Sequence, residues 1–278
     1  MIKIGMAKFR TIEISDPGFE ANNLRFITVK TPNLRGRGDI CVFVPPAINE
    51  GNAVPVVILL HGVYGSAWSW ALNTGVHLQA YQMMKQGMIP QMVIAMPSDG
   101  LWGDGSAYLA HNGQDFENWI AEDVFEALQN TIAGVSSSSA LFIGGLSMGG
   151  FGALRIGAKY GNKFQGVAAH SSITNLAQMK FFVEESLENY YQHNKTDEDV
   201  FETILKYRDQ LPPLRFDCGT DDLLIEYNRE LHQMLASEKI EHIYQENPGT
   251  HEWPYWKKHI GDALHFFGKL TGKQNGIE

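Results

Sequence analysis

One short stretch constrains the fold of this chain more than any other, the apolar run VPVVILL at residues 54–60. It is rich in β-branched residues and shows no alternation of apolar with polar side chains, which is typical of a strand buried on both faces of a parallel sheet. Parallel neighbours are joined by crossover connections, usually helices. The run therefore predicts a sheet that is covered by helices on both faces.

The remainder of the chain has the segments that such a sheet needs. Apolar runs predict strands at 23–31, 39–46, 90–98, 140–147, 164–172, 213–219 and 240–249, and helical spacing predicts helices at 75–87, 115–134, 149–161, 221–238 and 252–270. Strands that alternate with helices are typical of βαβ units. We therefore expect an α/β fold with a mostly parallel central sheet, formed by one domain over residues 1–278.

Only one long segment breaks this alternation. Residues 173–212 are polar, show helical character and contain no predicted strand. We interpret them as a helical insertion above the sheet.

Composition narrows the classes of partner. The net charge of −9 argues against nucleic acid and against an anionic membrane surface. The longest apolar run is too short to cross a bilayer, and the N-terminal MIKIGMAKFRTIEISDPGF has no apolar core of a signal peptide. We expect a cytoplasmic protein, although a trimmed export signal would not show in this sequence. The sequence leaves a homo-oligomer open.

The segment GGLSMGGFGA at 144–153 carries the strongest functional signal. Gly145-Leu146-Ser147-Met148-Gly149 matches the G-x-S-x-G pattern, and it stands between a predicted buried strand and a predicted helix. In that setting the pattern forms a tight turn that exposes a serine nucleophile, and the flanking glycines avoid collisions of the turn with neighbouring backbone. We therefore predict that Ser147 is catalytic.

A nucleophilic serine needs a base, and a histidine in a loop at the same edge of the sheet is the best candidate. His251 follows the last predicted strand in NPGTHEWPYW, which places it at the carboxyl edge of the sheet with Ser147. His170, at another strand end, is the second choice. His61 also ends a strand, but it precedes the serine and opens a glycine turn.

The acid that orients the histidine should follow a strand between Ser147 and His251. The segment FDCGTDDLL provides Asp217 within the predicted strand, and Asp221 and Asp222 after a Gly-Thr turn. Either of the last two could cap the following helix while the other orients the histidine.

Two backbone N–H groups should form the oxyanion hole. Met148 follows the nucleophile directly, and HGVYGS at 61–66 follows the buried strand, which makes Val63 the second donor. No metal spacing is present: the two cysteines, Cys41 and Cys218, lie far apart, and HEWPYW lacks the second histidine of a zinc motif. We expect no cofactor.

These segments together resemble the Putative esterase family of α/β-hydrolases, from about Leu24 to Phe267. That family includes S-formylglutathione hydrolases, feruloyl and acetyl-xylan esterases, and mycolyltransferases. The resemblance implies that the acid is Asp222, the second residue after Gly-Thr, and supports Val63 as the oxyanion donor. The Leu-Thr-Cys-Thr run of S-formylglutathione hydrolases is replaced here by VYGSAWSW, which favours the carbohydrate-ester branch.

The predicted active edge is rich in aromatic residues, which suit aryl groups and the apolar faces of sugars but also pack loops. The candidates for substrate contact are Tyr64, Trp68, Trp102 and Trp253. We predict a serine carboxylesterase for small acyl esters, carbohydrate-linked or aryl. A glutathione thioesterase, an acyltransferase to an alcohol or sugar, and a non-catalytic binding protein of the same fold remain alternatives.

Overall fold

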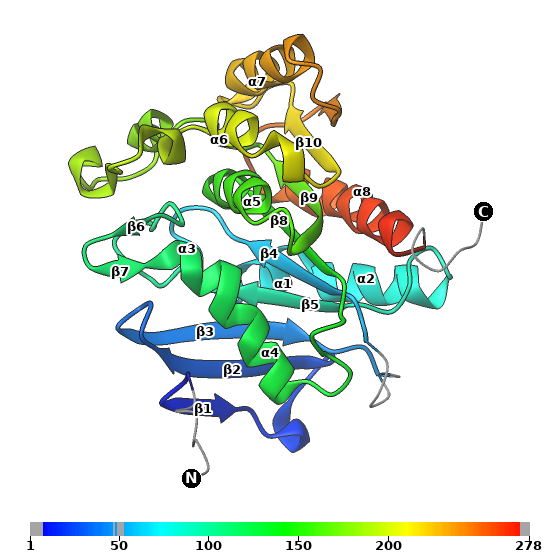
Figure 1. The fold of residues 1–278 in the computed structure, drawn as a ribbon. Helices are drawn as coiled ribbons and strands as arrows, with labels where there is room; N and C mark the ends of the chain where they lie inside the picture. The colour runs from blue at the N-terminus through cyan, green and yellow to red at the C-terminus, as the bar shows by residue number, and fades with distance from the viewer. Residues whose placement is uncertain (1–7, 47, 49–52, 273–278) are drawn as a thin grey trace.

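The computed structural model describes residues 8–46, 48 and 53–272 (Figure 1). Residues 1–7, the start of the N-terminal segment in which no signal-peptide core is expected, lie outside the described part. One sheet of nine strands runs through the molecule. Its strands are β1 (Thr11–Ile14), β2 (Leu24–Thr31), β3 (Gly36–Phe43), β4 (Val56–Leu60), β5 (Val93–Pro97), β8 (Leu141–Leu146), β9 (Phe164–His170), β10 (Leu214–Gly219) and β11 (Ile243–Asn247). Their spatial order is β1-β2-β3-β5-β4-β8-β9-β10-β11.

The sheet has an antiparallel part and a parallel part. Strands β1, β2, β3 and β5 pair antiparallel with one another, whereas every pair from β5 through β4, β8, β9 and β10 to β11 is parallel. All five residues of β4 are buried, in accord with the apolar run that defines it. The prediction of a mostly parallel α/β sheet is confirmed.

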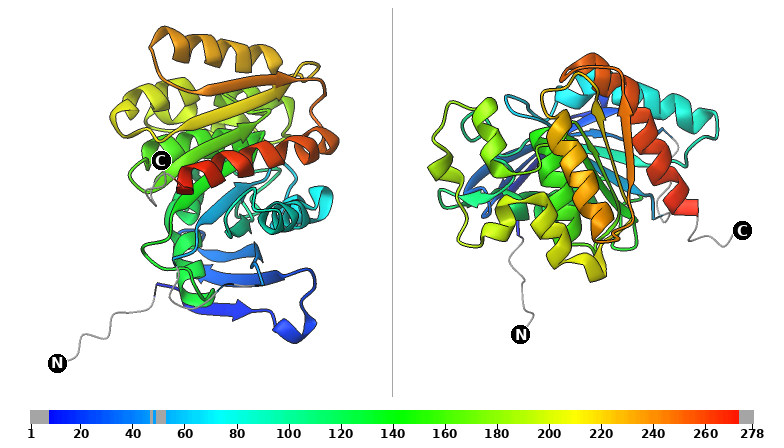
Figure 2. Two further views of the ribbon diagram at one scale, coloured as in Figure 1. Left: turned by 90° about the vertical axis from the view of Figure 1, so that its right-hand side faces the viewer. Right: turned by 90° about the horizontal axis from the view of Figure 1, so that it is seen from above.

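Helices cover both faces of the sheet, as Figure 2 shows. They are α1 (Ser69–Thr74), α2 (Val76–Lys85), α3 (Phe116–Asn118), α4 (Val124–Thr131), α5 (Met148–Lys159), α6 (Val200–Lys206), α7 (Ile225–Ser237) and α8 (Trp253–Gly272). Val56 and Ile58 of β4 belong to the core shared with α4 and α5, whereas Val57 and Leu59 belong to the core shared with α2 and α8. Alternate residues of one strand thus build two separate cores, because strand side chains alternate between faces.

Some elements differ from the sequence prediction. The helix expected at 115–134 is interrupted by a π-helical turn, Trp119–Asp123, between α3 and α4. Two polar groups of this turn bind loops at the ends of β5 and β2: Trp119 Nε1 donates to Ser98 O at 2.7 Å, and buried Asp123 accepts from Asn33 at 3.0 Å. Strand β1, helix α1 and the small hairpin of β6 (Ala110–His111) and β7 (Gln114–Asp115) were not expected, because each is too short for a clear periodic signal.

The insertion lies between β9 and β10 and packs on α5 through α6. It is helical as expected, but mostly as single 3₁₀ turns, with α6 as its one α-helix. The 3₁₀ turns are η3 (Leu176–Phe181), η4 (Leu187–Tyr190), η5 (Lys195–Glu198) and η6 (Arg208–Gln210). Three of these turns begin at a side chain that accepts a backbone hydrogen bond, which favours short turns over a continuous helix.

The two cysteines are buried in different parts of the sheet, Cys41 in β3 and Cys218 in β10. Both are free thiols. Burial raises the pKa of Cys41 to about 12 and also raises the pKa of Cys218. Within the described residues no helix is both long enough and apolar enough to cross a membrane.

Candidate active site

The serine of the G-x-S-x-G segment occupies a strained turn between β8 and α5. Ser147 has φ 76° and ψ −110°, a combination that a non-glycine residue rarely adopts. A Cβ on Gly145 would lie 2.2 Å from the carbonyl oxygen of Gly149, and a Cβ on Gly149 would lie 2.4 Å from that of Leu60. The glycines therefore let the turn approach β4 closely, as the sequence predicted.

Three side chains from three strand ends meet at this turn. Ser147 Oγ lies 2.9 Å from His251 Nε2, and His251 Nδ1 lies 3.0 and 2.9 Å from the two carboxylate oxygens of Asp222. Ser147 follows β8, Asp222 follows β10 and His251 follows β11, all at the carboxyl edge of the parallel strands. The structure thus joins the three predicted residues in one hydrogen-bonded chain.

Asp222 is held as a carboxylate by this chain. Burial alone would raise its pKa, but the hydrogen bond and the charge of His251 outweigh burial and lower the pKa of Asp222 below its usual range. Asp222 Oδ1 also accepts the N–H of Leu224 at 2.8 Å. Asp222 therefore orients the histidine and also holds the turn that precedes α7, whereas Asp221, which was the alternative, stays exposed.

The second-choice base occupies a different site. His170 is 1% exposed, and its Nδ1 lies 3.0 Å from Asp217 Oδ1. Tyr255 donates to the same oxygen at 2.9 Å, and Arg215 lies 3.3 Å from the other oxygen. His170 thus forms a buried polar pair within the sheet, and only its carbonyl oxygen contacts Ser147, by accepting the Ser147 N–H at 3.1 Å.

His61 is also occupied elsewhere. Its Nδ1 lies 2.7 Å from the carbonyl oxygen of Gly62, and its Nε2 accepts the N–H of Asp99 at 3.0 Å. Both ring nitrogens therefore hold loops beside the serine, which leaves neither free to act as a base.

The N–H groups of the two predicted oxyanion donors have no other backbone acceptor among the described residues. Met148 is the first residue of α5, whose N–H has no acceptor within its own helix. Val63 N–H donates to no acceptor within the part of the chain that the structure describes. Gly105 packs against both residues, since a Cβ there would lie 2.5 Å from Met148 Sδ and 3.4 Å from a Val63 methyl carbon.

The predicted aromatic contacts fall into two groups. Tyr64 and Trp68 are 66% and 46% exposed, as a substrate-contacting surface requires. Trp102 packs edge-on against His111 with ring centroids 4.6 Å apart, and Trp253 packs edge-on against Trp256 at 5.1 Å. These last two rings are partly committed to packing the loops.

Sequence reasoning missed the residue that packs on the imidazole of His251. The ring of Phe182, from the insertion, lies against His251 with centroids 5.3 Å apart and planes 31° apart, and Trp256 meets the same imidazole edge-on at 5.1 Å. No local pattern in the insertion marks Phe182, because its role depends on a contact with a residue far along the chain.

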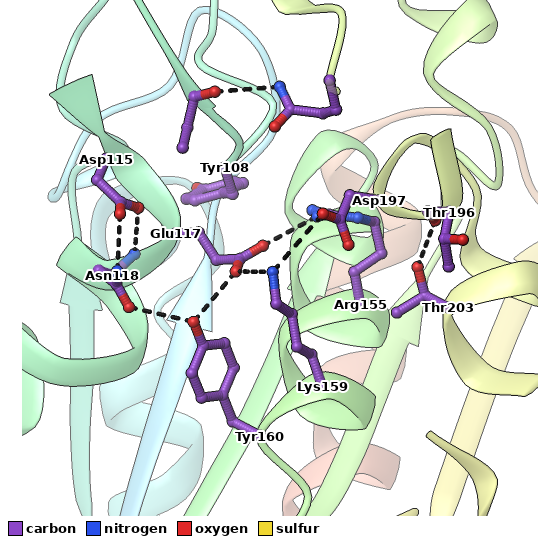
Figure 3. Close-up of polar contacts among 12 residues, drawn as sticks. Tyr108, Asp115, Glu117, Asn118, Arg155, Lys159, Tyr160, Thr196, Asp197 and Thr203 are labelled. Carbon is purple, nitrogen blue, oxygen red and sulfur yellow. Dashed lines mark hydrogen bonds and ion pairs between the residues drawn. The ribbon is translucent and has the colours of Figure 1, made fainter. Parts of the chain in front are cut away.

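A buried charged cluster was missed as well. Figure 3 shows Arg155 and Lys159 of α5 directed at Glu117, with N–O distances of 2.9 and 2.7 Å, and Asp197 of the insertion 3.7 Å from Lys159. Burial would raise the pKa of Glu117, but the charges of Arg155 and Lys159 lower it. The sequence did carry a signal for this cluster. Arg155 is the single charged residue in the apolar and glycine-rich stretch MGGFGALRIGA that follows Ser147, and the structure buries it fully.

A serine in a strained strand–turn–helix, linked to a histidine and a carboxylate at the carboxyl edge of a parallel sheet, defines an α/β-hydrolase. Comparison with known proteins agrees. The model of the family described as "Putative esterase" matches residues 32–267, so the chain belongs to this family and is a serine ester hydrolase.

Among curated proteins, an acetyl esterase of Caldicellulosiruptor saccharolyticus is 28% identical over 240 residues, which cover 80% of this chain and 86% of that protein. Two solved structures share the fold at low identity. An S-formylglutathione hydrolase of Staphylococcus aureus superposes with a TM-score of 0.74 at 18% identity over 91% of this chain and 98% of its own. A ferulic acid esterase of Anaeromyces mucronatus superposes with a TM-score of 0.69 at 22% identity over 95% and 96%.

Proposed function

We propose that this protein hydrolyses small carboxylic esters with Ser147 as nucleophile, His251 as general base and acid, and Asp222 as the group that orients the histidine. One observation carries the proposal: the continuous chain Ser147 Oγ–His251 Nε2, His251 Nδ1–Asp222, with each distance between 2.9 and 3.0 Å. This geometry lies within the hydrogen-bond reach that proton transfer requires.

In the first half-reaction His251 Nε2 takes the proton of Ser147 as its oxygen attacks the ester carbonyl. The N–H groups of Val63 and Met148 stabilise the tetrahedral oxyanion. His251 then passes the proton to the departing alcohol, and the C–O bond to that alcohol breaks. The product is an acyl-serine, and Asp222 stabilises the imidazolium that forms on the way.

In the second half-reaction water replaces the alcohol. His251 removes a proton from this water as its oxygen attacks the acyl carbonyl, and the same N–H groups stabilise the second oxyanion. Return of the proton to Ser147 Oγ releases the acid and restores the enzyme.

The substrate class follows from the relatives and the exposed aromatic residues. An acetyl esterase and a ferulic acid esterase are similar to this chain, and Tyr64 and Trp68 expose rings that suit sugars and aryl groups. We therefore propose esters of acetyl-type or feruloyl-type acids, carbohydrate-linked or aryl. The fold shared with an S-formylglutathione hydrolase makes a thioesterase the second candidate.

The test is a substrate panel for the purified protein and its Ser147→Ala variant. The panel holds p-nitrophenyl acetate, methyl ferulate, an acetylated xylo-oligosaccharide and S-formylglutathione. We expect ester hydrolysis that falls by about 10⁴-fold or more in the variant, with the fold kept by circular dichroism. Equal activity of the two proteins would refute the role of Ser147. A preference for S-formylglutathione would favour the thioesterase, and diversion of the acyl group to added sugar would favour acyl transfer.

A further inference from the structure

The loop that carries Val63 is tied to the insertion directly above the reacting groups. Tyr64 OH donates a hydrogen bond to the carbonyl oxygen of Phe182, and the ring of Phe182 lies against His251. We call this contact the Tyr64–Phe182 bridge. It joins the residue after one predicted oxyanion donor to the residue that covers the imidazole.

The bridge is held at both ends. Tyr64 N–H donates to Asp104 O at 2.7 Å, Asp104 N–H donates to Glu185 at 2.9 Å, and a carboxylate oxygen of Asp104 accepts the N–H of Glu184 at 2.8 Å. Three segments far apart in sequence are thereby fastened together: the loop after β4, the loop after β5 and the insertion.

The backbone of Tyr64 indicates that this contact is maintained against strain. Its φ of 58° lies in the left-handed region, which disfavours residues with a side chain. Such conformations persist where the surroundings fix them and are concentrated at functional sites. In this conformation the phenol of Tyr64 reaches the carbonyl oxygen of Phe182, while Val63, the preceding residue, keeps its N–H unbonded to other described backbone groups.

Little surface is left at the reacting groups below the bridge. Ser147 is 2% exposed, and the side chain of His251 is 14% exposed. The ring of Phe182 lies over one face of the His251 imidazole, and Trp256 meets the imidazole edge-on. A bulky acyl group that extends over this face would have to displace Phe182.

We propose that the Tyr64–Phe182 bridge determines specificity for acyl size, restricting the ester hydrolase to short acyl groups of the acetyl class. This inference rests on the proposed function, since it names the acyl group that the same serine accepts. Neither residue performs a chemical step: Phe182 limits the space over His251, and Tyr64 holds Phe182 in place.

The experiment measures kcat/KM for p-nitrophenyl acetate, butyrate and octanoate and for methyl ferulate in the wild type and three variants. For Phe182→Ala we expect the octanoate-to-acetate and ferulate-to-acetate ratios to rise about tenfold or more, the scale at which apolar contacts discriminate substrates. Tyr64→Phe keeps the ring and loses the donor, so the same ratios should rise by a smaller factor.

Phe181→Ala is the matched control. It removes the neighbouring ring of the same segment, which is 47% exposed and packs on Tyr227 with centroids 6.3 Å apart. Its ratios should stay at the wild-type values. Thermal denaturation of every variant separates a change in specificity from a loss of folding.

The outcomes separate this inference from the function on which it rests. A wild type that cleaves esters through Ser147 but prefers octanoate or ferulate overturns the inference and keeps the function. Unchanged ratios in Phe182→Ala, a uniform loss of activity on all four esters, or an equal change in Phe181→Ala overturn it as well. A wild type inactive on every ester overturns both.

Discussion

Two histidine–aspartate pairs lie within one short stretch of this sheet, and only one of them has the geometry of a catalyst. His251 and Asp222 stand on loops beyond the strand ends, and His251 Nε2 faces Ser147 Oγ at 2.9 Å. His170 and Asp217 stand inside β9 and β10, and His170 Nε2 has no hydrogen-bond partner among the described residues.

The difference shows that the pair itself does not make a catalytic base. Both aspartates have a lowered pKa, because the histidine and the other hydrogen-bond and charge partners together outweigh the burial that would raise it. What differs is the second nitrogen of each imidazole: His251 Nε2 faces Ser147 Oγ, whereas His170 Nε2 has no hydrogen-bond partner among the described residues. His251 also lies beyond the strand end, whereas His170 lies within β9. Asp217 is shared with Tyr255 and Arg215, which serves to hold α8 against the sheet.

Replacing the two histidines gives the largest expected contrast. His251→Ala should reduce kcat by about 10⁴- to 10⁶-fold, because the serine loses its base. His170→Phe should keep kcat within about tenfold of the wild type, because its imidazole touches no reacting group. Initial rates with p-nitrophenyl acetate measure both, and comparable losses in the two variants would abolish the distinction between the pairs.

The orienting carboxylate should give the next largest effect. Asp222→Asn keeps the shape of the side chain but favours the wrong imidazole tautomer, so kcat should fall by about 10⁴-fold. The melting temperature of Asp222→Asn should stay close to the wild-type value. Asp217→Asn is the matched control for activity, and a similar fall of kcat in that variant would contradict the assignment of Asp222.

The free energy of unfolding should show the opposite order, with the larger loss in Asp217→Asn. Asp217→Asn leaves His170 and Arg215 without a buried anion, and breaking such a pair costs about 3–5 kcal/mol of the free energy of unfolding. Urea denaturation at pH 7 measures this difference. An unchanged unfolding midpoint would show that the buried pair contributes nothing to the fold.

The difference in free energy of unfolding between Asp217→Asn and the wild type should depend on pH. The folded-state pKa of Asp217 is lowered, so its stabilising effect is complete above the unfolded value near 4 and is lost as pH falls through the folded value. The gap in free energy of unfolding between wild type and Asp217→Asn should therefore narrow as pH falls below 4. Unfolding curves at three pH values test the sign, and a gap that widens in acid would reverse the interpretation.

Removing one hydrogen bond from the buried pair should give the smallest effect. Tyr255→Phe deletes the donor to Asp217 and should lower the free energy of unfolding by about 1.5–3 kcal/mol, the range for hydrogen bonds to charged groups. Activity should stay near the wild-type value. A large loss of kcat would instead indicate that Tyr255 positions the His251 loop.

The sequence predicts the parts of the molecule that depend on the local pattern of residues. The buried runs predict the parallel strands, and local pattern and chain order predict Ser147 and His251 at their ends. Chain order left Asp221 and Asp222 open, and the family resemblance selected Asp222, which the structure places beside His251. Asp217 and His170 were both placed in or at the end of a strand, but their pairing was not predicted, since contact across β9 and β10 is set by register. Phe182 was missed for a similar reason, because nothing local records which distant ring a loop will cover.

The two buried thiols can report when each half of the sheet opens. Cys41 lies in the antiparallel part and Cys218 in the parallel part, beside Asp217. With their raised pKa values and their burial, neither reacts with a thiol reagent until its surroundings open. The rates at which the two cysteines become labelled therefore report the order in which the two halves of this sheet come apart.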